Sequence, residues 1–195
     1  MAHVTFKADV KAVIDGVNKE GELAEKAIRR TIGDMRSRGP GWVSKAVREE
    51  YNISPSDLKA AESTQNDGTV SFGHATVDNV TLVYRGRVLT PTHFKMKPAS
   101  RPASGKPYQV SAEIKKGNRK VLSGKAFLAK SGGEGTKQIP FQREGSDRLP
   151  IKAIKTISVP QMIEDGDGNL KEGIDKIINE NLQKRFEHYT KQYLS

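Results

Sequence analysis

Apolar residues recur at three- and four-residue steps at both ends of the chain, the spacing that places side chains on one face of an α-helix. The N-terminal stripe predicts a helix over residues 9–38, with Asp9 as its N-cap. Gly39-Pro40-Gly41 is expected to stop or kink that helix, and a second helix is predicted over residues 42–50. The C-terminal stripe predicts a helix over about residues 170–193; its members are Leu170, Ile174, Ile177, Ile178, Leu182, Phe186 and Tyr189.

The centre of the chain is predicted to form strands. Ser54-Pro55-Ser56-Asp57 first predicts a short helix, because Ser54 can cap it and proline suits the first helical position. From Gly68 the apolar period changes to two, the alternation of half-buried strands. Strands over residues 108–114 and 120–128 are expected to form a hairpin, and residues 138–143 a further strand.

The order of elements predicts an α+β fold. N-terminal helices precede a central antiparallel β-sheet or sandwich with a basic hairpin, and a C-terminal helix packs on the sheet. The proline-rich residues 91–107 are expected to form an exposed, mobile loop, and residues 131–135 a second flexible tip. We divide the chain into a helical segment (1–64), a basic β domain (65–163) and an acidic loop with a helix (164–195), integrated into one domain.

Positive charge is confined to the central segment. Residues 65–163 hold 17 Lys and Arg against 6 Asp and Glu, a net of +11, whereas residues 1–64 carry +1 (11 against 10) and residues 164–195 carry −2 (5 against 7). Basic surfaces attract polyanions by releasing their counterions. Only 35% of residues are hydrophobic and 6% aromatic, so we expect a modest core with extensive polar or interfacial surface.

The composition also indicates a location. No apolar run approaches the roughly 20 residues that span a bilayer, and the N-terminus lacks the pattern of a signal peptide. Without cysteine, disulfides and thiolate metal sites are excluded. We therefore expect no membrane contact and a protein that is cytosolic or assembles in the cytosol.

No catalytic, metal or nucleotide signature is present, so we predict neither enzymatic activity nor a cofactor. The four histidines are isolated and no Gly-x-Ser-x-Gly occurs. The acidic residues 165–169 resemble a calcium loop faintly, but Lys176 stands where a bidentate Glu is needed. Gly124-Lys125 fails the phosphate-loop pattern, because no glycine precedes it at the required spacing and Ala126 stands where Ser or Thr is needed.

The basic hairpin is the best candidate for a polyanion-facing surface. Such side chains can contact phosphates without reading sequence. The alternative is that a charged hairpin tip merely keeps the strands soluble. The candidate residues are Arg85, Arg87, Lys115, Lys116, Arg119, Lys120 and Lys125.

Residues 141–162, FQREGSDRLPIKAIKTISVPQM, combine several conspicuous motifs. Most of the apolar residues in this strand-turn-strand are expected in the core: Phe141, Leu149, Ile151, Ile154 and Ile157. Arg143 and Arg148 are interaction candidates, because a guanidinium can satisfy several acceptors.

This stretch resembles the minor tail protein Z family of tailed phages. "REEYNISPSDLKAA" (48–61), "AEIKKGNRKVLSGKAFLA" (112–129) and "RFEH" (185–188) extend the resemblance in the family's order. It implies a structural virion protein, without catalysis or cofactor, that completes the head-proximal end of the tail for joining to the head. The motif and interface positions are Phe141, Arg143, Arg148, Leu149, Pro150, Ile151, Pro160 and Met162.

The resemblance also implies partners and a place of assembly. It implies a ring-like homo-oligomer near the DNA channel, assembled in the host cytoplasm, that contacts tail-terminator, tail-tube or head-connector proteins. Non-specific contact with phage DNA is a further expectation. Two features depart from the family: the Gly39-Pro40-Gly41 interruption and the proline-rich loop, which we interpret as an insertion. The rival hypothesis is a non-specific nucleic-acid-binding module without a virion role.

Overall fold

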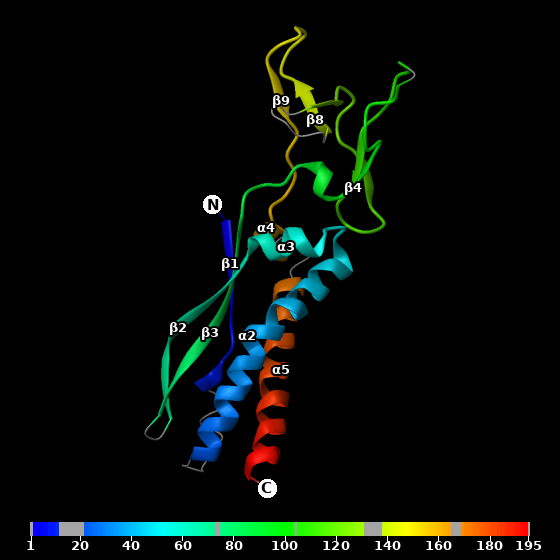
Figure 1. Ribbon diagram of the computed structural model, residues 1–195. Helices are drawn as coiled ribbons and strands as arrows, with labels where there is room; N and C mark the ends of the chain where they lie inside the picture. The colour runs from blue at the N-terminus through cyan, green and yellow to red at the C-terminus, as the bar shows by residue number, and fades with distance from the viewer. Residues whose placement is uncertain are drawn as a thin grey trace.

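The computed structural model describes residues 2–11, 22–72, 75–103, 105–130, 138–164 and 169–194. It is an elongated α+β molecule in two parts (Figure 1). We call residues 87–157 the head and residues 2–86 with 158–194 the stalk. The loop predicted at 131–135 and the central residues 165–168 of the loop predicted at 164–169 fall outside the described residues.

The stalk combines a sheet with helices. Its antiparallel sheet has the strand order β1-β3-β2 and is formed by β1 (Ala2–Lys7), β2 (Glu62–Phe72) and β3 (Ala75–Gly86). Its helices are α2 (Glu22–Glu50), α3 (Pro55–Ala61), α4 (Val159–Glu164) and α5 (Asn169–Leu194). The predicted helix starts at 54–57 and near 170 are both confirmed, and the Ser54 hydroxyl accepts the Asp57 N–H as expected.

Helix α2 corrects the prediction of two separate helices. It continues through Gly39-Pro40-Gly41, so that this tripeptide neither stops nor divides it. Gly39 is buried, and a Cβ built there would lie 3.0 Å from the Leu82 Cδ1 atom, so glycine lets the helix approach β3 closely. Tertiary packing of the helix therefore overrides the local cost of Pro40.

The N-terminal strand β1 is a second correction. Residues 2–7 alternate between exposed and buried, with Val4 and Phe6 facing the core, whereas we predicted no strand before residue 9. His-Val-Thr-Phe-Lys carries a period of two that could have revealed this strand. Of the helix predicted to start at Asp9, Val10 and Lys11 are helical, and residues 12–21 lie outside the described part.

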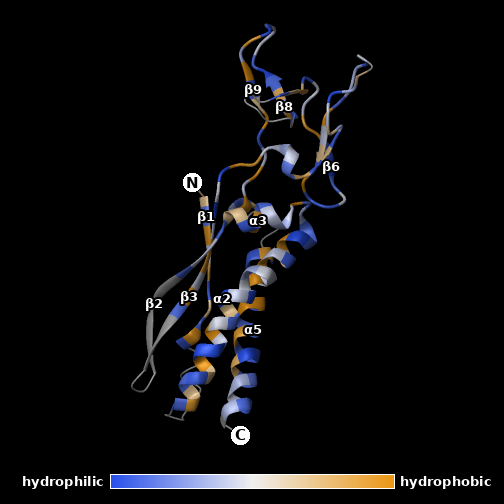
Figure 2. Ribbon diagram, viewed as in Figure 1, coloured by the Kyte–Doolittle hydropathy of each residue, from blue (hydrophilic) through white to orange (hydrophobic). Residues whose placement is uncertain are grey.

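The two long helices pack on one another and cover one side of the sheet. The buried face of α5 contains Leu170, Ile174, Ile178, Leu182 and Phe186, as its stripe predicts. This helix contacts mainly α2, and its buried residues share one core with residues of β1 and β3, as expected for a C-terminal helix that packs on the sheet. Asp34 of α2 adds a polar tie, because its carboxylate accepts the Tyr189 hydroxyl at 3.0 Å and lies 3.6 Å from the Arg185 Nε atom. Figure 2 shows the hydrophobic residues of the two helices interleaved with polar ones along their length.

The head consists of short strands around a small core. One antiparallel sheet contains β4 (Lys95–Lys97), β5 (Ser111–Glu113) and β6 (Arg119–Val121); the other contains β7 (Phe127–Lys130), β8 (Gln138–Arg143) and β9 (Ile151–Ala153). The described residues thus form three three-stranded sheets rather than one central sheet or sandwich. The head has a hydrophobic core of its own, separate from that of the stalk. Its buried members among the described residues are Val110, Ala126 and Leu128.

The junction between head and stalk is ordered. Pro91–His93 form a short 3-10 helix (η1), and Pro91 and Phe94 are buried, so the first part of the predicted loop 91–107 is structured. The two connecting chains hydrogen-bond to each other, Leu89 N–H to the Ile157 carbonyl and Thr156 N–H to the Leu89 carbonyl. The head is therefore joined to the stalk by two paired segments.

Candidate nucleic-acid interface

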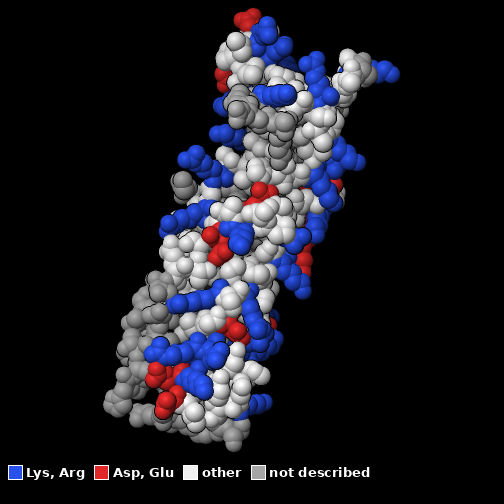
Figure 3. Space-filling model, viewed as in Figure 1, with Lys and Arg blue, Asp and Glu red and all other residues white. Residues whose placement is uncertain are grey.

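The net charges of the head and the stalk differ more clearly than those of the three sequence segments. The head carries 16 Lys and Arg against 4 Asp and Glu, a net of +12, whereas the stalk carries 17 against 19, a net of −2. In Figure 3 the upper part of the visible face shows mainly basic side chains, and the lower part mixes both signs. The structure thus confines the positive excess to one end of an elongated body.

The predicted basic hairpin exists, but its tip is docked on the stalk. Strands β5 and β6 pair as expected, and Gly117 takes the positive φ of 73° in the turn. The Lys116 N–H donates to the Glu50 carbonyl at the last residue of α2, and the Lys115 ammonium lies 5.7 Å from the centre of the Tyr51 ring. Cations at a helix C-terminus are stabilised by the helix dipole. The tip therefore joins head to stalk and does not project as an isolated finger.

Glu113 organises this joint. Its carboxylate accepts the Gly117 N–H at 3.1 Å and the Asn52 side-chain amide at 3.0 Å, and the Arg119 guanidinium donates to it at 3.1 Å. The Gly117 bond first, then the Asn52 bond and the charges of Lys95 and Arg119, hold the pKa of Glu113 below its ordinary value despite some desolvation. Arg119 also donates to the Lys95 carbonyl, so part of its hydrogen-bonding capacity is used inside the head.

The other candidate cations are spread over the head and its junction. Lys120 and Lys125 are exposed on the head, and Arg85 and Arg87 are exposed where β3 ends. Arg87 lines a hollow of about 480 Å³ that it shares with Lys155. The seven residues predicted to face a polyanion therefore do not converge on one tip.

Two further hollows lie beside the outermost strands. On the β9 side of β8, a hollow of about 480 Å³ is lined by Arg143, Lys152 and Lys155 among others. On the β7 side, a hollow of about 430 Å³ is lined by Lys125 and Arg143. Lys152 and Lys155 were not among the residues that the sequence singled out. Their signal was their position beside Arg143 and Arg148 in the same 22-residue stretch.

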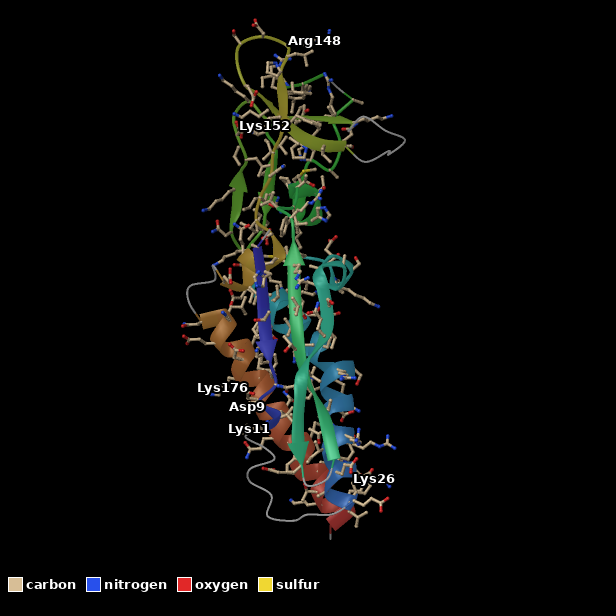
Figure 4. The ribbon with its side chains drawn as sticks, turned by 90° about the vertical axis from the view of Figure 1, so that its left-hand side faces the viewer. Asp9, Lys11, Lys26, Arg148, Lys152 and Lys176 are labelled. Atoms are coloured by element: carbon tan, nitrogen blue, oxygen red, sulfur yellow. The ribbon has the colours of Figure 1, made fainter. Side chains whose placement is uncertain are left out.

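The family-motif positions separate into three places. Phe141 on β8 stacks with Phe127 of β7 at 6.2 Å between ring centres, and the Arg143 guanidinium lies 5.7 Å from the centre of the Phe127 ring. Arg148, Leu149 and Pro150 are exposed in the β8–β9 loop at the far end of the head, where Figure 4 labels Arg148. Pro160 and Met162 are buried in α4, at the base of the head.

The core assignment of two residues in this stretch was wrong. Leu149 is 67% exposed and Ile151 37% exposed, although both were expected inside. These side chains lie at the β8–β9 connection, and no other described segment of the chain buries them. Ile154 and Ile157 are half-buried against the two cores, as their apolar character predicts.

One serine, one aspartate and one histidine do meet, but in a structural arrangement. The Ser54 hydroxyl donates to one Asp57 carboxylate oxygen at 2.6 Å, and the His93 Nδ1 atom lies 2.8 Å from the other. A nucleophile relay needs the imidazole to bond the hydroxyl. Here the carboxylate lies between them and ties η1 to the start of α3. Within the described ranges, no three His, Asp or Glu residues are grouped as metal ligands.

No family model, curated protein or solved structure matches the chain. Within the part of the chain that the structure describes, none of the helices has the length and apolar character needed to cross a membrane.

Proposed function

We propose that the protein is a structural component of a phage particle that assembles with copies of itself at the head-proximal end of the tail and turns its basic head toward DNA. The observation that carries the proposal is the division of charge, a head of net +12 on an elongated stalk of net −2. The ordered sequence motifs that resemble the minor tail protein Z family supply the virion context.

Two structural features support assembly. The chain exposes 11916 Å² of surface, whereas a compact monomer of 21.5 kDa exposes about 9,200 Å². Among the described residues of the head, the separate core has three fully buried members. Extended shape and a thin core are typical of subunits that bury further surface against neighbours. Like-charged heads in a ring repel one another, and a DNA duplex at the ring centre offsets that repulsion.

The second candidate function is a non-specific nucleic-acid-binding module without a virion role. The charge of the head favours it equally, because counterion release requires no assembly. The two candidates differ in oligomeric state and in protein partners.

Sedimentation-velocity and native mass measurements of the full chain test the assembly. The chain is examined alone and with any tail-tube or tail-terminator protein that is encoded beside its gene. We expect a closed homo-oligomer or a complex with one of these proteins. A strict monomer that binds none of them refutes the virion role and leaves the second candidate.

Fluorescence anisotropy with a labelled 30-base-pair duplex tests the contact with DNA. The head variant Lys120→Gln/Lys125→Gln is compared with the stalk variant Arg30→Gln/Lys45→Gln, which removes the same charge from exposed positions of α2. We expect the slope of log K against log salt to fall by about 2 in the head variant and to stay unchanged in the stalk variant. Equal effects of the two variants, or no binding at low salt, would refute the DNA-facing role of the head.

A further inference from the structure

The exposed apolar tip of the β8–β9 loop is the feature that the proposed function leaves unexplained. Leu149 and Ile151 are 67% and 37% exposed, and the rigid ring of exposed Pro150 stands between them. The β8–β9 loop, in which Figure 4 labels Arg148, lies at the end of the molecule farthest from the C-terminal part of α5 (Figures 1 and 4). Three consecutive apolar residues at a projecting end are suited to insertion into a partner.

Basic side chains border this tip on both edges of the ribbon. Arg148 directly precedes Leu149, and Lys152 directly follows Ile151. Farther down, Arg143 lines both outer hollows, with Lys152 and Lys155 on the β9 side and Lys125 on the β7 side. The tip also contains two carboxylates, Asp147 and Glu144, and Glu144 lies 3.9 Å from the Lys152 ammonium. The apolar end is thus flanked in sequence by Arg148 and Lys152, and two hollows with basic side chains lie behind it.

We propose that the β8–β9 hairpin is a minor-groove wedge. Leu149, Pro150 and Ile151 press against a base step of duplex DNA, and Arg143, Arg148 and Lys152 contact the phosphates on either side. Apolar wedges of Leu, Ile or Pro flanked by Arg and Lys are a recurring means of entering the minor groove, where they unstack a step and kink the duplex. Such a site selects deformable steps rather than a base sequence.

The arrangement of charge favours DNA over an anionic lipid surface. A duplex offers one phosphate strand on each side of an inserted ribbon, and the hollows lie on the β9 side and on the β7 side of β8. A bilayer offers phosphates in one plane. Positive charge also continues over the whole head, through residues such as Lys120 on β6, which suits a long polyanion that follows the surface.

The inference rests on the proposed contact between the head and DNA. Bending of the duplex distinguishes the wedge from a DNA contact without insertion. The full-length double variant Leu149→Ser/Ile151→Ser keeps every charge of the head. The matched control is Val121→Ser, because Val121 is an apolar residue of the same head that is 53% exposed on β6. Circular dichroism and thermal unfolding test whether the variants fold. If the double variant does not fold, Leu149→Ala alone replaces it.

Fluorescence energy transfer between dyes on the two ends of a 30-base-pair duplex reports bending. We expect wild-type protein to increase the transfer, and duplex saturated with netropsin to lose the increase because the minor groove is filled. In Leu149→Ser/Ile151→Ser the bend is lost and binding weakens about tenfold, with the salt slope unchanged. Val121→Ser behaves as wild type, and Arg148→Gln lowers the salt slope by about 1.

The other outcomes have distinct meanings. Duplex binding without bending, or bending that survives Leu149→Ser/Ile151→Ser, overturns the wedge and leaves the proposed function intact. No duplex binding by wild-type protein overturns both. Binding to phosphatidylserine vesicles that requires Leu149 and Ile151, without any DNA bend, overturns the wedge and assigns the tip to a lipid surface.

Discussion

The close contact between helix α2 and strand β3 at Gly39 leads to a prediction with a built-in control. Gly39→Ala places a methyl group 3.0 Å from the Leu82 Cδ1 atom and 3.7 Å from its Cδ2 atom. Carbon atoms in optimal contact are about 3.5–4.0 Å apart, so one contact is too short by about half an ångström. At Gly33, on the same helix, a Cβ meets no atom within 4 Å.

The two substitutions share a helix-propensity gain and differ in the clash. Replacing glycine by alanine in a helix interior stabilises by about 1 kcal/mol. Overpacking in a buried contact costs about 1–3 kcal/mol. We expect Gly33→Ala to raise the free energy of unfolding by about 1 kcal/mol. The free energy of unfolding of Gly39→Ala should be about 1–3 kcal/mol lower than that of Gly33→Ala. Gly39→Ala should therefore lie between the wild-type stability and about 2 kcal/mol below it.

Urea unfolding followed by circular dichroism measures the difference. With a slope of about 2 kcal/mol per molar urea, the midpoints of the two variants should differ by about 0.5–1.5 M. Leu82→Val removes the clashing δ carbons, so in that background the Gly39→Ala penalty should disappear. Equal stabilisation by both alanines, or a penalty that persists with Val at position 82, would refute the close-approach explanation.

Three further predictions concern Pro40, the interhelical tie and the joint between head and stalk. Pro40→Ala should raise the urea midpoint by about 1 M, because an alanine restores a helical N–H and removes most of a cost of about 3 kcal/mol. Asp34→Ala should lower the free energy of unfolding by about 1.5–3 kcal/mol, because it removes the acceptor of the Tyr189 hydroxyl; Tyr189→Phe in the same background should cost little more. Because the folded-state pKa of Glu113 is lowered, its contribution is complete above the unfolded pKa of about 4.3 and is lost as pH falls through the folded value. The protection factor of the Lys116 amide, which corrects for the intrinsic pH dependence of exchange, should therefore fall below about pH 4.3 in wild type but not in Glu113→Gln, and identical pH profiles of the protection factor would contradict this.

Local sequence patterns correctly predicted the elements that depend on interactions between residues close together in the chain. The capped start of α3 follows from Ser54 and Asp57, and the apolar face of α5 from its three- and four-residue steps. The hairpin turn at Gly117 likewise needs only a residue that tolerates a positive φ. In each case the determining interactions join residues within one or two turns of the chain.

Non-local contacts decided the elements that were predicted incorrectly. Helix α2 passes through Pro40 because its buried face packs on both β3 and α5, and no local signal states how much that packing contributes. Leu149 and Ile151 carry the pattern of a core strand, but no described segment packs over them at the far end of the head. Apolar character predicts a preference for burial and says nothing about whether a partner surface exists.

The sequence by itself determined the α+β class, the terminal helix and the presence of a strongly basic central region. Only the tertiary structure decided where that charge acts. It docks the hairpin tip at Lys116 onto the end of α2 and leaves Arg143 and Arg148 at the far end of the head. The physical reason is that charge is a property of each residue, whereas its accessibility depends on which segments distant in the chain fold against it.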